Sequence, residues 1–192
     1  MRSRETTRRG ASEAVSGPAS EYVAARRVLL DALTALEGHL DNLILVGAHA
    51  VYHHAGEVDL NVPILTTDGD LAIDTRDLAD VPEIGAVMRR AGFVPGLNPG
   101  HWVEKGDVAV DLMVSPHQAG TAKASARAAR LAPHEKSTAR IARGLEPALV
   151  DNERVTIAAL DLDDLRTCDL RIAGPAALLI AQAIEIAERL GQ

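Results

Sequence analysis

The sequence predicts an α/β (α+β) protein in which helices flank a mixed central β-sheet. Three observations favour this class. A short apolar run at residues 43–46 enters Gly47 and continues into a segment with helical spacing, which is typical of a buried strand that turns into a helix. Two later segments alternate apolar and polar residues at strand period, and helical periodicity recurs between and after them. With 192 residues, 47% of them hydrophobic, the chain is long enough to bury a core.

The N-terminal part divides into a tail and a helix. Residues 1–19 are small or polar and hold four Arg against two Glu, so we expect a flexible polar tail. Residues 20–192 are expected to form a single domain. From about Ser20 the apolar residues recur at three- and four-residue spacing as far as Gly38, which predicts a helix that packs on the sheet.

The centre of the chain is predicted to contain a strand at 42–46, a helix at 47–55 and a second strand at 68–74. Because side chains alternate along a strand, Asp68 and Asp70 should share one face at a spacing of about 6.5 Å. Leu71 and Ile73 should then point to the core. The two carboxylates therefore line the same side of the sheet.

A helix and a hairpin are expected next. The sequence 78–93 is predicted to be a helix with Pro82 near its first turn and Gly92 as its C-cap. The segments 101–104 and 107–114 read as two strands joined by Lys105 and Gly106. In the second strand Asp111 faces away from the apolar residues Val108, Val110, Leu112 and Val114. If this strand neighbours the strand at 68–74, three carboxylates converge.

The segment 116–145 is basic, with six Lys or Arg residues and one Glu in a chain of net charge −7. This contrast indicates a surface for a polyanion. The basic residues form two sets at i, i+4, i+7 spacing, which would place each set on one face of a helix. The sets are Lys123, Arg127 and Arg130, and Lys136, Arg140 and Arg143. The alternative is a solvated surface whose charge neighbouring residues balance.

The chain is predicted to end with strands near 154–160 and 169–173 and a final helix at 174–192, opened by Gly174 and Pro175. The apolar side chains of this helix should dock on the sheet, and its narrow polar face should present Gln182 outward or toward the site. The apolar set is Leu178, Leu179, Ala183, Ile186 and Leu190, and the polar set is Gln182, Glu185, Arg189 and Gln192.

Three converging carboxylates repel one another, and a divalent cation is the economical explanation for them. Hard oxygen ligands suit Mg²⁺, or Mn²⁺, which keeps positions open for substrate phosphates. A helix N-terminus that begins at Gly47 offers backbone N–H groups to the same phosphates. Together these features predict a phosphoryl-transfer site with Asp68, Asp70 and Asp111 as metal ligands. The alternative is a pair of surface aspartates satisfied by solvent and backbone.

A strand ending in Gly, a helix, a strand with an Asp-x-Asp pair and a third Asp on a later strand resemble the polymerase-β-type nucleotidyltransferase superfamily. Within it, Thr67 before the Asp pair and the segment 171–190 resemble the minimal enzymes that include abortive-infection (AbiEii-type) toxins. The resemblance covers roughly residues 40–190, and the three aspartates are its most specific part.

The resemblance implies transfer of a nucleotide from a nucleoside triphosphate to a hydroxyl of RNA, tRNA, a protein or a small molecule. It also implies a role as the toxin of a toxin–antitoxin system, with a cognate antitoxin as partner. In this hypothesis Asp68, Asp70 and Asp111 are catalytic. Nucleotide contacts are then expected from Gly47, Ala48, Thr67 and Lys136.

Two positions depart from the family pattern. The family's Gly-Ser or Gly-Gly pair is Gly47-Ala48 here, and Gln182 stands where relatives tend to carry Lys. The alternative function is therefore a catalytically weak or inactive nucleotide- or RNA-binding module, or a regulatory partner of a toxin–antitoxin pair, on the same fold.

Other chemistries find less support. His49 and His53 have the i, i+4 spacing of half a zinc site, but no Glu follows His49 and no third ligand is evident, so core or surface histidines are the alternative. Neither a Gly-x-Ser-x-Gly nor a Gly-x-Gly-x-x-Gly motif occurs. The single Cys predicts a reducing compartment, the cytoplasm. No apolar run approaches the ~18 residues needed to cross a bilayer, so no membrane partner is expected.

Overall fold

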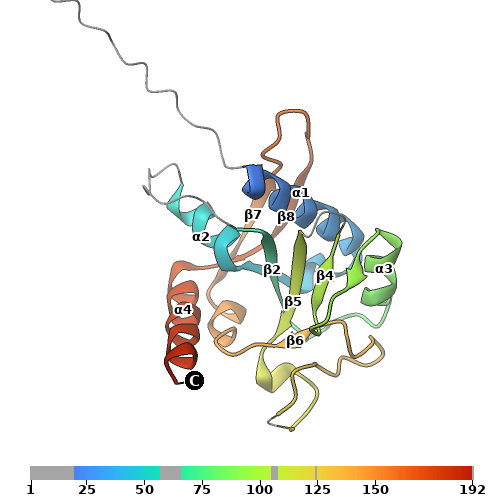
Figure 1. Ribbon diagram of the computed structural model, residues 1–192, viewed down its shortest axis with the longest axis vertical. Coiled ribbons are helices and arrows are strands. Elements are labelled where there is room, and N and C mark those ends of the chain that lie inside the picture. The colour runs from blue at the N-terminus through green and yellow to red at the C-terminus, as the bar shows by residue number, and fades with distance from the viewer. Residues whose placement is uncertain (1–19, 57–65, 105–107, 124, 192) are drawn as a thin grey trace, which may run out of the picture.

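The computed structural model describes residues 20–56, 66–104, 108–123 and 125–191 (Figure 1). It is an α+β structure with a mixed, open central sheet and flanking helices, which confirms the expected class. The helices are α1 (Ser20–Ala35), α2 (Gly47–Ala55), α3 (Ile84–Arg90) and α4 (Pro175–Leu190), with 3-10 turns η1 (Glu37–Asn42), η2 (Pro116–Gln118) and η3 (Glu146–Leu149). The strands are β1 (Leu43–Val46), β2 (Asp68–Ile73), β3 (Val94–Pro95), β4 (His101–Val103), β5 (Ala109–Val114), β6 (Arg140–Ile141), β7 (Asn152–Ala158) and β8 (Thr167–Ala173).

The described strands form one sheet in the order β3-β4-β5-β2-β1-β8-β7, and β6 pairs with the end of β5. Its pairing is mixed. β2 lies antiparallel to β1 and parallel to β5, whereas β1 is parallel to β8. The two strands predicted to carry aspartates, β2 and β5, are therefore direct neighbours, as their convergence required.

Helix α1 covers one face of the sheet and contacts β2, β5 and β8. A Cβ atom added to Gly69 would lie 3.0 Å from the Leu29 side chain of α1, so Gly69 faces this helix. Leu71 and Leu112, which pair in register, are fully buried on the same face. Because side chains alternate along β2, Asp68 and Asp70 point to the opposite face. Their predicted placement is confirmed.

Three helix boundaries differ from the prediction. Helix α1 ends at Ala35, and Gly38 lies within the 3-10 turn η1 that follows. The helix expected at 78–93 is confined to Ile84–Arg90, because the Glu83 side chain caps it by accepting the backbone N–H of Gly85 and Ala86. Pro82 therefore precedes the helix rather than lying in its first turn. Gly92 follows it with a φ of 99°, as a C-terminal glycine should.

The prediction that the basic residues lie on helical faces is wrong. Where the structure describes the segment 119–139, the backbone is irregular, and hydrogen bonds between distant parts of the segment replace those of a helix. Ala129 donates to the Ala139 carbonyl and Arg130 donates to the Ala119 carbonyl. Arg140 lies in β6, beside Met113 of β5. These long-range backbone bonds replace the local ones of a helix, and Pro133 lacks the N–H that a helix would use.

The predicted docking face of α4 is also wrong. Leu179, Ile186 and Leu190 are 72%, 55% and 83% exposed, and within α4 only Ala177 and Leu178 are buried. The helix packs against α2 and η3, at the edge of the molecule in Figure 1. The inward face consists instead of Ala177, Leu178, Ala181 and Ile184, which are buried or half-buried, so of the predicted apolar set only Leu178 docks. Gln182 and Glu185 lie beside this face, exposed at the edge of a cavity.

Several predictions fall outside the described residues. These are the polar tail at 1–19, the connection around Pro63 and the hairpin turn at Lys105 and Gly106. Strands β4 and β5, which flank that turn, are antiparallel as expected. Among the helices that the structure describes, none has the length and apolar character needed to cross a membrane.

Candidate functional site

The aspartates come together through strand register. Asp70 of β2 lies directly beside Asp111 of β5, and Asp68 is two residues earlier on the same face of β2. Parallel neighbours in register present their side chains on the same side of a sheet. The prediction that the three carboxylates lie on the same face of the sheet is therefore confirmed.

Gly47 brings the N-terminus of α2 against this surface. Strand β1 pairs with β2, and Val46 lies opposite Asp70, so the turn into α2 occurs beside the carboxylate. Gly47 has a φ of 63°, which favours glycine. A Cβ atom at this position would overlap the Asp70 carboxylate, approaching its Cγ to 2.7 Å. The absence of a side chain lets the Asp70 carboxylate approach the positive end of the α2 dipole.

Burial and neighbouring charge raise the pKa of both aspartates of β2, that of Asp70 by a large amount. Burial raises its pKa to about 7, with further contributions from the Asp111 and Asp68 carboxylates, while Arg140 acts in the opposite direction. Burial and Asp111 also raise the pKa of Asp68, against a hydrogen bond from Thr67 and the charge of His101. A carboxyl group that resists ionisation beside two others suits a site that receives a cation.

Two basic side chains hold Asp111. His101 Nδ1 lies 2.6 Å from Asp111 Oδ1, and Arg140 Nε donates to Asp111 Oδ2 at 3.1 Å. His101 lies opposite Asp111 in the β4–β5 register. Sequence reasoning did not assign His101 to the site, because the predicted two-residue turn at Lys105 and Gly106 would pair His101 with Val110, whereas the structure pairs it with Asp111. Arg140 was predicted to meet a polyanion, but its contact with Asp111 depends on the long-range pairing of β6 with β5.

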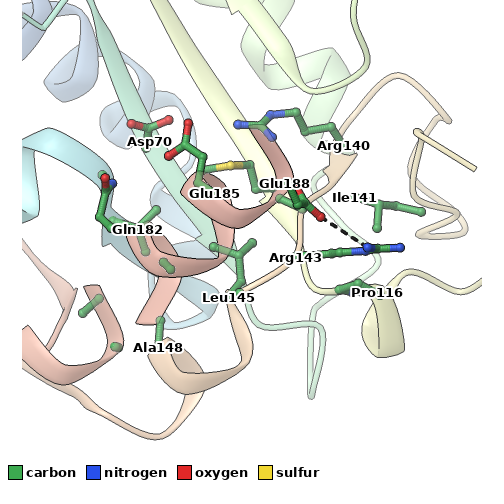
Figure 2. Close-up of a pocket in the computed structure, with 18 of the residues that line it drawn as sticks. Asp70, Pro116, Arg140, Ile141, Arg143, Leu145, Ala148, Gln182, Glu185 and Glu188 are labelled. Atoms are coloured by element: carbon green, nitrogen blue, oxygen red, sulfur yellow. Dashed lines mark hydrogen bonds and ion pairs between the residues drawn. The ribbon is translucent and has the colours of Figure 1, made fainter. Parts of the chain in front are cut away.

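A cavity of about 680 Å³ opens beside Asp70 (Figure 2). Gly47 and Ala48 form part of its wall, and α4 supplies Gln182 and Glu185. Glu185 points toward Asp70 in Figure 2, and its charge adds to the rise in the Asp70 pKa. Gln182 thus faces the cavity, which was one of its two expected orientations. Sequence reasoning placed Glu185 on the polar face of the helix but did not assign it to the site.

Cations line the opposite side of the cavity. Arg140 and Arg143 belong to its lining, and Arg143 Nη1 lies 3.3 Å from Glu188 of α4. Lys123 also belongs to the lining. The cavity therefore combines the Asp70 carboxylate of β2 and the acids of α4 with basic side chains near β6, which is a charge arrangement suited to a ligand that carries both metal and phosphate.

The remaining predicted site residues differ in position. Thr67 is exposed, and its side chain acts to lower the pKa of the adjacent Asp68. Lys136 is exposed and lies outside the lining of this cavity, and the preceding Glu135 forms an ion pair with Arg89 of α3 at 2.5 Å. The structure thus brings Gly47 and Ala48 to the aspartates but does not bring Lys136 to them.

The histidines near α2 have structural partners. His49 is buried, its Nδ1 accepts from Arg26 Nε at 3.4 Å, and its ring stacks on Tyr22 with centroids 4.9 Å apart. His54 Nε2 lies 2.8 Å from the Ala173 carbonyl oxygen. These contacts match the core and surface roles that were the alternative to zinc.

The aspartates fit a divalent cation in residue type and share one face of the sheet. The raised pKa of Asp70 is the electrostatic signature that a cation would relieve, and carboxylate oxygens are suitable ligands for Mg²⁺. Within the described parts of the chain, no three His, Cys, Asp or Glu side chains are already arranged to hold a metal ion. The Asp111 carboxylate is instead turned to His101 and Arg140, so it would have to exchange these partners to become a ligand.

Comparison of the chain with protein-family models, with curated proteins and with solved structures found no match.

Proposed function

We propose that this protein is a divalent-cation-dependent nucleotidyltransferase that moves a nucleotide from a nucleoside triphosphate to a hydroxyl acceptor. The observation that carries the proposal is the placement of Asp70 beside Asp111 under the glycine-led N-terminus of α2. The resemblance to polymerase-β-type nucleotidyltransferases supports it through the same residues. RNA, tRNA, a protein and a small molecule are all candidate acceptors, and a toxin role with a cognate antitoxin belongs to the same proposal.

Each part of the site has a role in this proposal. Asp68 and Asp70 would hold Mg²⁺ or Mn²⁺, which would neutralise the triphosphate and the charge that develops on the leaving phosphates. The N–H groups at Gly47 and Ala48 would donate to phosphate oxygens. Asp111 would lie nearest the attacking hydroxyl. Arg140 and Arg143, on the far wall of the cavity, would balance phosphate charge once Arg140 leaves Asp111.

A second candidate is a binding module without turnover. The observation that favours it is the engagement of Asp111 by both His101 and Arg140, which leaves the third carboxylate turned to protein partners. The neutral Gln182 on the cavity wall also supplies no charge to a transition state. Such a module would bind a nucleotide or RNA with its cation and release it unchanged.

Transfer of label from each of the four α-³²P nucleoside triphosphates to bulk cellular RNA and protein tests the main proposal. With Mg²⁺ or Mn²⁺ present, we expect labelling by the wild type. Asp70→Asn and Asp111→Asn should each lower it by about 10²-fold or more, because each removes a charged ligand needed in the transition state. Asp163→Asn, which neutralises an exposed aspartate in the turn between β7 and β8, is the matched control.

The outcomes separate the two candidates. Retained labelling in both site variants would overturn the assignment of the aspartates. If the wild type labels nothing, isothermal titration with each nucleoside triphosphate, with and without Mg²⁺, decides the rest. Cation-dependent binding that Asp70→Asn abolishes would support the binding module, and no binding would exclude both functions.

A further inference from the structure

The outward face of α4 carries an apolar stripe that no other part of the described chain covers. Leu179, Ile186 and Leu190 are 72%, 55% and 83% exposed, and Ile180 beside them is 45% exposed. The charged residues of α4 pair elsewhere, Arg189 with Glu185 and Glu188 with Arg143. The stripe consists of Leu179, Ile180, Ala183, Ile186, Ala187 and Leu190. An uncharged stripe of this length on a surface helix marks an interaction site.

We propose that the α4 stripe is a homodimer interface, in which α4 packs antiparallel against α4 of a second copy. The spacing of the stripe carries this assignment. Leu179, Ala183, Ile186 and Leu190 follow one another at intervals of four, three and four residues. This is the a/d spacing at which two helices pack side by side with interlocking side chains.

The stripe is complementary to itself about a twofold axis. In the antiparallel pairing, Leu179 meets Leu190 of the partner subunit and Ala183 meets Ile186 of the partner subunit, and each contact occurs twice. The small side chain of Ala183 leaves room for the larger side chain of Ile186 of the partner subunit. Beside the seam, Ile180 meets Ala187 of the partner subunit, and Gln182 lies near Arg189 of the partner subunit. The pairing therefore brings no like charges together.

The available surface is large enough for a specific contact. The 16 residues of α4 span about 24 Å. An apolar groove extends the stripe toward α2, where Val51 and Tyr52 line it together with Leu178 and Leu179. Two such faces bury on the order of 1,000 Å² in total, which is the size at which specific interfaces begin. The stripe holds neither a charge nor a hydrogen-bonding side chain that would specify a different, polar partner.

The dimer would also stabilise the wall of the cavity. Only Ala177 and Leu178 of α4 are buried in the monomer, and yet the same helix contributes Gln182 and Glu185 to the cavity. Packing its other face against a second helix would keep these two side chains in place. The inference concerns the surface and stands whether or not the cavity transfers nucleotides.

Sedimentation velocity of the full chain over about 1 to 100 μM tests the dimer. We expect a dimer that Ile186→Glu converts to monomer, with the dissociation constant raised at least about 10-fold, because the new charge would be buried without a partner. Leu162→Glu makes the same kind of change at a residue that is 95% exposed in the turn between β7 and β8, and it should remain dimeric. Circular dichroism checks that both variants fold.

Disulfide formation tests the antiparallel register in the background Cys168→Ser, which removes the only native cysteine. Leu179→Cys and Leu190→Cys proteins are prepared separately, one with an added mass tag. On oxidation, a mixture of the two should give the mixed disulfide, whereas each protein alone should give little. A monomer at every concentration, a dimer unaffected by Ile186→Glu, or cross-linking of each variant to itself would overturn the proposal.

Discussion

At the scale of single residues, Gly47 and Asp70 depend on each other. The carboxylate of Asp70 occupies the place that a side chain at position 47 would need, and it therefore lies at the first residue of α2. The sequence predicted the glycine as a turn into a helix and the aspartate as a metal ligand. It could not show that one makes room for the other, because the contact arises only when β1 and β2 pair.

The first prediction tests this dependence. Gly47→Ala should destabilise the protein by about 1–3 kcal/mol more than Gly56→Ala, since the added methyl group overlaps Asp70. Gly56 is a matched control because its φ is 61° and no atom lies within 4 Å of an added Cβ. Chemical unfolding measures both. Equal losses, or an unchanged Gly47→Ala penalty in an Asp70→Ala background, would contradict the contact.

His49 provides a pH-dependent prediction. Burial, reinforced by the charge of Arg26, lowers its pKa from 6.5 to about 3. Between these values the unfolded chain binds a proton that the folded protein does not. The free energy of unfolding should therefore fall as the pH drops below 6.5, by up to about 1.4 kcal/mol per pH unit, and should be independent of this group above 6.5.

Urea unfolding at several pH values between 7.5 and 4.5 measures this effect. His49→Phe should flatten the decline relative to the wild type, apart from a constant loss due to the Arg26 contact. His117→Gln, at an exposed histidine, should follow the wild-type curve. Parallel curves for His49→Phe and the wild type would show that another group is responsible.

At the scale of elements, hydrophobic periodicity predicted the strands and helices whose position depends mainly on the local sequence. The run into Gly47, the alternation around Asp70 and the alternation around Asp111 all became elements at the expected residues. Orientation was less predictable for α4. Its sequence is apolar almost all round, so periodicity did not decide which face docks, and the tertiary structure left Gln182 and Glu185 exposed on the wall of the cavity.

The basic segment shows the limit of spacing as evidence. Its i, i+4, i+7 pattern exists in the sequence, but backbone bonds to β5 and within the loop draw the chain into irregular structure. Residues that the spacing placed in one set, such as Lys136 and Arg140, therefore lie at different places in the structure. Arg140 lines the cavity, whereas Lys136 does not.

A comparison of these two residues gives the third prediction. Arg140→Gln should weaken binding of a nucleoside triphosphate by about 10-fold and reduce its sensitivity to salt, because a cation is lost and Asp111 is left uncompensated. Lys136→Gln should bind as the wild type does. Isothermal titration at two ionic strengths compares them. If Lys136→Gln weakened binding and Arg140→Gln did not, Lys136 would belong to the site and Arg140 would not.

At the scale of the whole molecule, the cavity is assembled from segments far apart in the chain. The β1–α2 turn and β2 supply one wall, the segment around Arg140 supplies another, and α4 closes the site from the C-terminal end. Helix α4 contributes Gln182, Glu185, Glu188 and Arg189 to the lining; Arg189 is paired with Glu185, and Glu185 adds to the negative charge around Asp70. A triphosphate in this cavity would thus meet cationic side chains near β6, whereas Gln182 would offer it no charge.

The last prediction tests this imbalance. Gln182→Lys should raise nucleoside triphosphate affinity, or turnover where turnover is measured, by about 10-fold, because an ammonium group can pair with phosphate where an amide donates only a neutral hydrogen bond. Ala176→Lys adds the same charge to an exposed position of α4 that does not line the cavity and should have little effect. Isothermal titration with Mg²⁺ present compares the two variants with the wild type. Equal affinities in all three would mean that the bound phosphates do not reach the α4 wall, and any triphosphate would then lie against α2 and Arg140 alone.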